Sequence, residues 1–598
     1  MFQIKYSAVT LFVLFILSIS LSLRAQTRNP DITVQELEKH IYFLASDSLE
    51  GRKPGTKGAK EAAVYIREQY AGAGLQPMGE NGFQYFNVTT SITKGLGNQL
   101  KINNTVYKLN TDFVPLVFSS NDTLFAEVVF TGFGLKPEQD SIRWDDYKDV
   151  DVAGKWVLVL RGDPEPDEDE SVFILNSSDR DKALLARDHD AAGILLVNGP
   201  QFGDKLTGNS FEHVTADVGI PAINITQTVA DQLLEKSGFT IDSLEKEIIK
   251  SKQPHSFSTG ATLYAVTDVV KNEVATQNIM YFIEGSDPEL KNEYVIIGAH
   301  YDHLGLGGHG SGSRMPDTVA VHNGADDNAS GTAGILELAE KLDTNRDQLR
   351  RSVLFISFGA EEMGLLGSQY FTNHPLIDLK NVEIMFNFDM IGRLDTTNKG
   401  IMVAGTGTAV GLDSLLVLYE KNSSLAFNHS PGGYGASDHA SFYASGIPVL
   451  FFTTGAHNDY HTPFDDADKI NYEGEKEVLD YAYPLIVDLI NNDSGLTYRE
   501  AEPGKKKAGV GRGLKVKLGI MPDFTSAGND GLGVGGVTKG GPAWKAGMMK
   551  GDKIIAINGL KVTNIYDYMN RLKKFKPGQT ISVDVIRNDK KTVLIVVL

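Results

Sequence analysis

Residues 294–303 read YVIIGAHYDH, a short apolar run that ends in a cluster of polar side chains. An uninterrupted apolar run of this length is typical of a strand that is buried on both faces of a parallel sheet. Its polar end, His300–His303, then lies at the carboxyl edge of the sheet, where open α/β sheets bind ligands. The stretch therefore predicts an α/β fold with a functional site at the end of this strand.

The same pattern recurs further along the chain. Three more apolar runs are each followed by an acidic residue or a histidine: SVLFISF (352–358) by Glu361 and Glu362, EIMFNF (383–388) by Asp389, and GIPVLFFT (446–453) by His461. A single such residue has an ordinary explanation, since Asp327 suits a helix N-cap and an acidic pair suits a first helical turn. Several at successive strand ends point elsewhere, because neighbouring carboxylates repel unless a cation or a proton lies between them. We predict a mixed, mainly parallel sheet flanked by helices, with a metal site at its edge.

The amino-acid composition excludes several kinds of site and of partner. The 598 residues include no cysteine, which excludes a thiol nucleophile, a disulfide scaffold and a Cys-ligated metal. Oxygen and imidazole donors favour a divalent metal, with zinc the best candidate. The chain has 57 Lys and Arg against 76 Asp and Glu, a formal charge of −19. This argues against nucleic acid as a partner, because a polyanion needs a basic surface.

The first 25 residues have the pattern of a secretory signal peptide. A start with one lysine precedes an apolar run at 8–23, and Ala25 stands at the expected cleavage position. An uncleaved membrane anchor is the alternative, although the run is short for a full span. No other apolar run approaches twenty residues. We therefore expect an exported protein, periplasmic or extracellular, with no membrane span in the mature chain.

Six strings together resemble the two-zinc exopeptidases that include the bacterial leucyl aminopeptidases and glutamate carboxypeptidase: GAHYDH (298–303), GADDNASG (324–331), GAEEMGLLGS (359–368), NFDMIG (387–392), GYGASDHASF (433–442) and YHTPFD (460–465). They occur in the order of that family, and LASDSLEGRKPGTKG (44–58) resembles the opening of its bacterial aminopeptidase branch. The resemblance covers about 31–495 and implies a zinc exopeptidase fold. It also implies a bacterial zinc aminopeptidase that removes N-terminal residues from peptides through a two-metal-activated water.

The resemblance implies a role for individual residues of this chain. It implies two zinc ions per chain and five ligands: His300 and Asp389 on one ion, Glu362 and His461 on the other, and Asp327 as the bridge. Asp326 is the rival for the bridge, but the spacing to Ser330 favours Asp327. Three other histidines match no position of the family pattern and are expected not to be ligands: His303, His309 and His322.

Three further residues would act in the reaction. Glu361 would be the general base that takes the proton of the attacking water and delivers it to the leaving amine. Asp302 would orient the ring of His300 through a carboxylate–imidazole bond. Tyr434 would stabilise the oxyanion, with Tyr460 as the alternative.

Two other functions stay open from the residues alone. A carboxypeptidase or amidohydrolase on the same dinuclear centre would cut amino-blocked peptides, whereas an aminopeptidase requires the free amine. A non-catalytic peptide-binding protein would keep its ligand after metal removal, and the six intact strings argue against it.

Two smaller modules accompany the catalytic sequence. DVDVAGKWVLVLRGDP (149–164) and DKALLARDHDAAGILLVN (181–198) resemble the protease-associated domain, a small α/β insert, which we expect at 112–262. GLGVGGVTKGGPAWKAGMMKGDKIIAINGLKV (531–562) resembles a PDZ domain, small and β-rich, which we expect at 513–598 after a linker at 496–512. The catalytic domain would then comprise 26–111 and 263–495.

The PDZ-like module has a candidate binding loop of its own. Backbone amides at Leu518, Gly519 and Ile520 would capture the carboxylate of a peptide or protein C-terminus. The alternative is a structural appendage that binds nothing.

Overall fold

The computed structural model describes residues 31–137, 143–165, 171–173, 176–200, 203–206, 216–501, 515–523 and 530–598. The predicted signal peptide (1–25) lies outside these residues, as does the predicted linker from residue 502 onward. The chain divides into two units, 1–86 with 276–307 and 318–501, and 87–275 with 308–317 and 502–598. Within the described ranges, no helix is long and apolar enough to cross a membrane.

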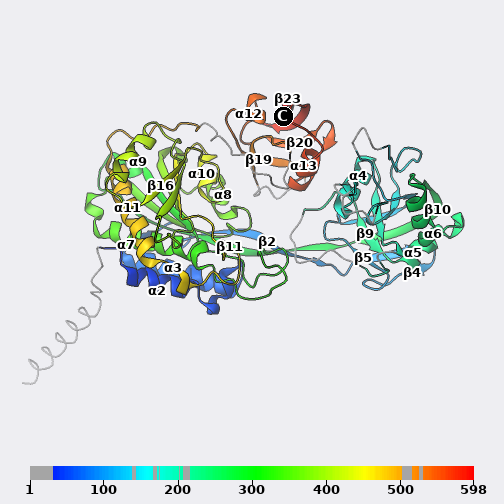
Figure 1. Cartoon of the computed structure of the whole chain (residues 1–598), viewed down its shortest axis with the longest axis horizontal. Helices are drawn as coiled ribbons and strands as arrows, with labels where there is room; N and C mark the ends of the chain where they lie inside the picture. Colours follow the sequence, from blue (N-terminus) through cyan, green and yellow to red (C-terminus); the bar gives the residue numbers. More distant parts are fainter. Residues whose placement is uncertain are drawn as a thin grey trace, which may run out of the picture. The chain divides into compact units, whose positions relative to one another are not determined.

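The first unit is built on a mixed sheet (Figure 1), with strand order β1-β11-β13-β12-β14-β17-β15-β16 and β2 beside β11. Its strands are β1 (Gln76–Pro77), β2 (Phe83–Lys94), β11 (Val269–Ile283), β12 (Tyr294–His300), β13 (Ser352–Phe358), β14 (Val382–Phe388), β15 (Gly400–Ala404), β16 (Ala426–Ser430) and β17 (Val449–Thr453). The four strands predicted from apolar runs, β12, β13, β14 and β17, are parallel neighbours. Strands β11 and β15 join them antiparallel. The predicted mixed, mainly parallel sheet is confirmed.

Helices cover both faces of this sheet. They are α2 (Val34–Leu44), α3 (Lys57–Ala73), α7 (Gly331–Thr344), α8 (Leu366–Asn373), α9 (Leu412–Glu420), α10 (His439–Tyr443) and α11 (Tyr472–Asn491). Short helical turns complete the unit: η1 (Asp47–Arg52), η5 (Leu290–Asn292), η6 (Ala325–Ser330), η7 (Arg346–Gln348), η8 (Leu379–Asn381) and η9 (Ala467–Lys469). Consecutive residues of β12 point to opposite faces of the sheet and pack against different layers of helices. Ile297 packs in the cluster with α2, α3, α7 and α11, whereas Ile296 packs in the cluster with α8 and α10.

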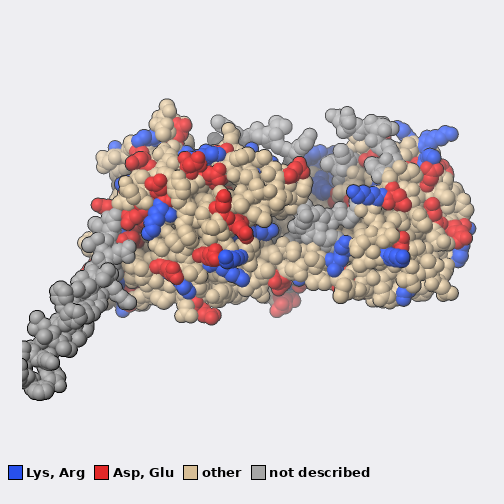
Figure 2. All heavy atoms as spheres, turned by 90° about the horizontal axis from the view of Figure 1, so that it is seen from below, with Lys and Arg blue, Asp and Glu red and all other residues tan. Residues whose placement is uncertain are grey.

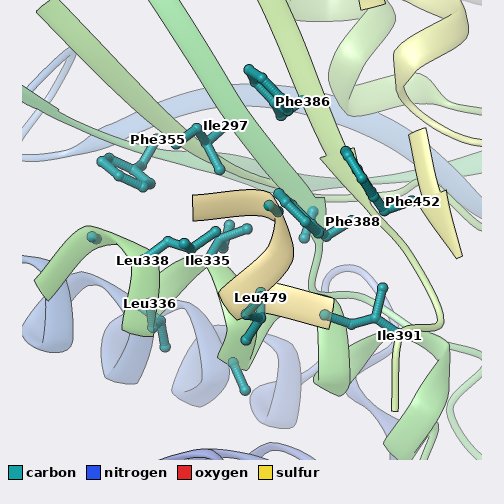
Figure 3. Close-up of a cluster of buried hydrophobic side chains, with 14 of the residues drawn as sticks. Ile297, Ile335, Leu336, Leu338, Phe355, Phe386, Phe388, Ile391, Phe452 and Leu479 are labelled. Atoms are coloured by element: carbon teal, nitrogen blue, oxygen red, sulfur yellow. The ribbon is translucent and has the colours of Figure 1, made fainter. Parts of the chain in front are cut away.

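The hydrophobic cluster that contains Ile297 holds in place the strand ends that carry the predicted site residues. In Figure 3, Phe355, Phe386 and Phe388 of the sheet lie above Ile335 and Leu338 of α7. All of these side chains are fully buried, and each contributes about 1.5–3 kcal/mol of burial free energy. The carboxyl ends of β12 and β14 are thereby held in place beside the first turns of α7.

The second unit contains two sheets. The first has strand order β4-β3-β10-β6-β7-β8-β9-β5, in which β6 to β9 are parallel. Its elements are β3 (Gln99–Ile102), β4 (Thr105–Val106), β5 (Phe113–Pro115), β6 (Asp122–Thr131), β7 (Trp156–Leu160), α4 (Asp179–Asp188), β8 (Gly193–Val197), β9 (Ala222–Ile225), α5 (Gln227–Leu234), η4 (Glu235–Ser237), α6 (Ile241–Ser251) and β10 (Ser256–Thr267). Strands β3 and β4, which precede the predicted start of the insert at residue 112, belong to this sheet through β10.

The second sheet is small and antiparallel, with strand order β18-β19-β20-β22-β23 and β21 beside β20. Its elements are β18 (Ile520–Asp523), β19 (Leu532–Val537), α12 (Pro542–Lys545), β20 (Lys553–Ile557), β21 (Leu560–Lys561), α13 (Ile565–Leu572), β22 (Thr580–Arg587) and β23 (Lys590–Val597). It has a core of its own around Leu532, Ile554 and Val583. This is the β-rich C-terminal module that the sequence predicted.

On the face of the chain shown in Figure 2, Lys and Arg lie scattered among Asp and Glu.

Candidate metal centre

The side chains predicted to hold metal come together at the carboxyl edge of the first sheet. His300 is the last residue of β12, and Asp389 directly follows β14. His300 Nε2 lies 3.3 Å from Asp327 Oδ1 and 3.5 Å from Asp389 Oδ1. His461 Nε2 lies 3.1 Å from Asp327 Oδ2 and 3.1 Å from Glu362 Oε2. The two oxygens of Asp327 thus face two different histidines.

The spacing and burial of these atoms fit divalent metal ions. Zinc bonds of about 2.0–2.2 Å at tetrahedral angles place neighbouring ligand atoms about 3.3–3.6 Å apart, close to the spacings of 3.1–3.5 Å found here. His300 is 1% exposed and Asp327 is 3% exposed. Asp389 Oδ1 is buried with no hydrogen-bond partner among the described residues. His300, Asp327 and Asp389 could therefore hold a metal ion, and their imidazole and carboxylate donors suit zinc.

Asp326 belongs to a different network from its neighbour Asp327. Its Oδ1 accepts a hydrogen bond from the Gly392 amide at 2.7 Å, and its Oδ2 lies 3.2 Å from His457 Nε2. Asp465 Oδ2 accepts hydrogen bonds from the amides of both Asp326 and Asp327, each at 3.0 Å. Asp327, and not Asp326, therefore faces both His300 and His461.

Asp302 holds the turn that carries Glu361. Its Oδ1 accepts a hydrogen bond from the Glu361 amide at 2.9 Å. His300 Nδ1 contacts the carbonyl oxygen of Asp302 at 3.2 Å and lies 3.8 Å from its carboxylate. The ring of His300 thus contacts the backbone carbonyl of Asp302, while the Asp302 carboxylate accepts the Glu361 amide. The predicted carboxylate–imidazole bond stays a prediction.

The two adjacent glutamates have opposite electrostatic surroundings. Glu361 Oε2 lies 3.9 Å from His300 Nε2, and burial raises the pKa of Glu361 well above its ordinary value. Burial also acts on the pKa of Glu362, but the contacts from His303 and His461 outweigh it and leave the pKa lowered. Neighbouring carboxyl groups with diverging pKa values are typical of a proton-transfer site.

The backbone is in the left-handed region at three points of this centre. Ala360 before Glu361 has φ 58°, Met390 after Asp389 has φ 59°, and His461 has φ 55°. Such conformations cost on the order of 1–3 kcal/mol each and persist where the surrounding structure fixes them. The cluster is therefore held at some cost in backbone energy.

The two tyrosine candidates lie in different surroundings. The ring of Tyr460 stacks on His461 with centroids 3.8 Å apart. Burial and the carboxylates of Asp327 and Glu362 raise the pKa of Tyr460, so its hydroxyl stays protonated. The ring of Tyr434 packs edge-on against Tyr443. Tyr460 thus lies beside the expected ligand His461, and the role predicted for Tyr434 stays a prediction.

Sequence reasoning missed Arg52, which ties the loops of the centre together. Its guanidinium is buried and donates to the carbonyl oxygens of Tyr301 (2.7 Å), Asn323 (2.6 Å), Gly324 (3.0 Å) and Leu44. The preceding Gly51 has φ 68°, and a Cβ there would lie 2.4 Å from Gly305 O. The glycine in the string LEGRKPG was the available signal, since it indicates a tight turn at this position.

His303, which we expect not to be a ligand, lies beside Glu362. Its Nδ1 lies 2.8 Å from Glu362 Oε1 and 3.9 Å from Asp327 Oδ2. These three residues form a second set that could hold a metal ion. By contrast, His322 Nδ1 contacts the carbonyl oxygen of Ala320 at 2.9 Å, and His309 pairs with Asp317.

The candidate loop of the C-terminal module is partly occupied by its own chain. Leu518 is fully buried, and its amide bonds to the Tyr568 hydroxyl. The amides of Gly519 and Ile520 are the better candidates for a carboxylate. Strand β18, which starts at Ile520, is an edge strand, and a free strand edge suits the addition of an extended peptide.

Comparisons with known proteins agree with this architecture. The model of Peptidase family M28 matches residues 278–486, that of the PA domain matches 115–233, and that of the PDZ domain matches 515–598. Aminopeptidase YwaD of Bacillus subtilis (strain 168) is 30% identical over 399 residues, which cover 62% of this chain and 67% of the relative. An aminopeptidase of Pseudomonas aeruginosa (strain UCBPP-PA14) is 26% identical over 447 residues, which cover 71% and 70%.

A solved structure, the aminopeptidase from Aneurinibacillus sp. strain AM-1, is 23% identical with a TM-score of 0.46, over 79% of this chain and 98% of that chain. The resemblance that the six strings predicted is confirmed by the family and domain matches and by the relative YwaD. The chain belongs to peptidase family M28 and carries a PA domain and a PDZ domain.

Proposed function

We propose that the chain is a zinc aminopeptidase that removes N-terminal residues from peptides, with two zinc ions per chain. The observation that carries the proposal is the carboxylate of Asp327 between two imidazoles, with Oδ1 facing His300 and Oδ2 facing His461. One ion would be held by His300, Asp327 and Asp389, and the other by Asp327, Glu362 and His461. Relatives named aminopeptidase support the choice of the amino end.

The residues around the centre supply the remaining chemistry. Bound zinc lowers the pKa of a water and polarises a carbonyl. Glu361, buried beside His300, would accept the proton of the attacking water on its carboxylate and pass it to the nitrogen of the leaving amine. The hydrogen bond from the Glu361 amide to Asp302 keeps that side chain in position. The Tyr460 hydroxyl would donate to the oxyanion.

The proposal also covers location and the accessory modules. The signal-peptide pattern at 1–25 supports an exported bacterial protein, periplasmic or extracellular. The edge strand β18 and the amides of Gly519 and Ile520 support a PDZ groove for a peptide or protein C-terminus. Strands β3 and β10 pair within the insert sheet, which supports an insert longer than 112–262.

The direct test compares leucyl peptides that have a free amine with the same peptides blocked at the amine. The mature chain should cut only the free-amine peptides, one residue at a time from the amino end. Cleavage of the blocked peptides would favour a carboxypeptidase or amidohydrolase instead. Peptide binding that persists after chelation, with no cleavage of either substrate, would favour a non-catalytic binding protein.

A further inference from the structure

We propose that His303 is an additional ligand, through Nδ1, of the metal position formed by Glu362 and His461. This inference rests on the dinuclear centre proposed above and goes beyond its five expected ligands. It makes the two metal positions unequal, with three protein donors on the His300 side and four on the His461 side.

Two imidazoles converge on the carboxylate of Glu362. His303 Nδ1 lies 2.8 Å from Oε1, and His461 Nε2 lies 3.1 Å from Oε2. The two rings lie at 73° with centroids 5.8 Å apart. Asp327 Oδ2 is within 3.9 Å of His303 Nδ1 and 3.1 Å of His461 Nε2. His303 therefore faces the same two carboxylates as the expected ligand His461.

The contact between His303 and Glu362 brings together buried polar atoms that lack a well-aligned hydrogen bond. His303 Nδ1, His303 Nε2 and Glu362 Oε1 are all buried, and none has a hydrogen-bond partner among the described residues. A hydrogen bond would align the ring N–H with the oxygen, and leaving three such atoms unsatisfied is costly. Buried imidazole and carboxylate donors that converge in this way could hold a shared cation.

The position of His303 is fixed by its surroundings. Its ring is 1% exposed, and its amide donates to the Arg52 carbonyl at 3.4 Å. A Cβ on Gly324 would lie 2.5 Å from His303 Cδ2, so glycine at 324 makes room for the ring. The imidazole is thus held at the centre from two sides.

Unequal donor numbers imply different tasks for the two positions. Zinc sites with four protein donors are closed, whereas sites with three keep an open place for water or substrate. The open place is then on the side of His300, next to Glu361, whose Oε2 is 3.9 Å from His300 Nε2. The position that includes His303 should bind zinc more tightly and load first.

Zinc titration of the metal-free full chain against a chromophoric chelator tests this. The wild-type chain should bind two zinc ions with distinct affinities. His303→Ala should weaken the tighter one by more than about a hundredfold, beyond the 10–100-fold that loss of an outer hydrogen-bonding partner costs. His322→Ala is the matched control, a buried histidine of the same segment, and should bind zinc as the wild type does.

If His303 only positioned Glu362 through a hydrogen bond, its variants would show a different pattern of zinc affinities. In His303→Asn, the amide can still donate to Glu362 but is a poor zinc ligand, so it should bind as weakly as His303→Ala. Recovery of wild-type affinity in His303→Asn would overturn the proposal, and so would an affinity of His303→Ala equal to that of His322→Ala. A wild-type chain that binds fewer than two zinc ions would instead refute the dinuclear centre itself.

A second measurement needs no stable variant. In the full chain labelled with ¹⁵N-histidine and loaded with ¹¹³Cd, a scalar coupling should join one cadmium to the Nδ1 of a third histidine besides His300 and His461. Couplings confined to those two histidines would overturn the assignment of His303.

Discussion

Glu361 lies beside the metal cluster without being one of its expected ligands, which makes its role separable from metal binding. Glu361→Gln replaces a carboxylate that can accept a proton with an amide of the same shape that cannot. We expect this variant to keep its zinc and to lose at least about a hundredfold in kcat, the lower range for a general base. Steady-state kinetics and elemental zinc analysis on one preparation check this. Glu362→Gln is the comparison and should lose zinc, while normal turnover by Glu361→Gln would remove Glu361 from the mechanism.

Tyr460 and Tyr434 can be distinguished by removing one hydroxyl at a time. Because Tyr460 stacks on His461 and Tyr434 packs on Tyr443, only Tyr460→Phe should remove a donor from the centre. We expect it to lower kcat by about 10²–10³, the cost of one oxyanion donor, and to leave KM nearly unchanged. Tyr434→Phe serves as the control with kcat near that of the wild type. The opposite result would return the role to Tyr434.

At the scale of elements, Arg52 joins the N-terminal η1 turn to both ends of the loop that connects β12 to η6. Arg52→Met leaves several buried carbonyl oxygens without a donor, and each unsatisfied group costs about 1–3 kcal/mol. We expect a loss of at least about 2 kcal/mol in the free energy of unfolding together with weaker zinc binding. Urea denaturation and zinc titration measure the two effects. Arg67→Met, at a partly exposed arginine beside Glu68, is the matched control, and equal stability of both variants would contradict the role of Arg52.

The elements also show how far the sequence could predict this structure. The apolar runs identified β12, β13, β14 and β17, because strands buried on both faces leave a continuous pattern. The pairing of β3 with β10 could not be predicted, because pairing between strands far apart in the chain leaves no local signal. The contacts of Arg52 and His303 could not be predicted for a related reason. Their partners are backbone carbonyls and a glutamate in other loops, which only the folded chain brings near.

At the scale of the whole molecule, the centre lies in the first unit alone, so metal should stabilise that unit selectively. Removing zinc leaves buried carboxylates such as Asp327 and Asp389 to repel each other, whereas zinc at 100 times its Kd stabilises by about 2.7 kcal/mol. In calorimetry of the full chain, chelation should lower the midpoint of one unfolding transition and leave that of the PDZ module in place. An equal shift of every transition, or no shift, would contradict a centre confined to the first unit.

The most direct measurement of the central claim is a zinc titration of activity. Zinc is added stepwise to the metal-free chain while the hydrolysis of a leucyl substrate with a free amine is followed. The account predicts no activity without metal and a plateau at two zinc ions per chain, with the amino-blocked substrate untouched throughout. Full activity in the metal-free chain, or a plateau at one zinc ion, would contradict it.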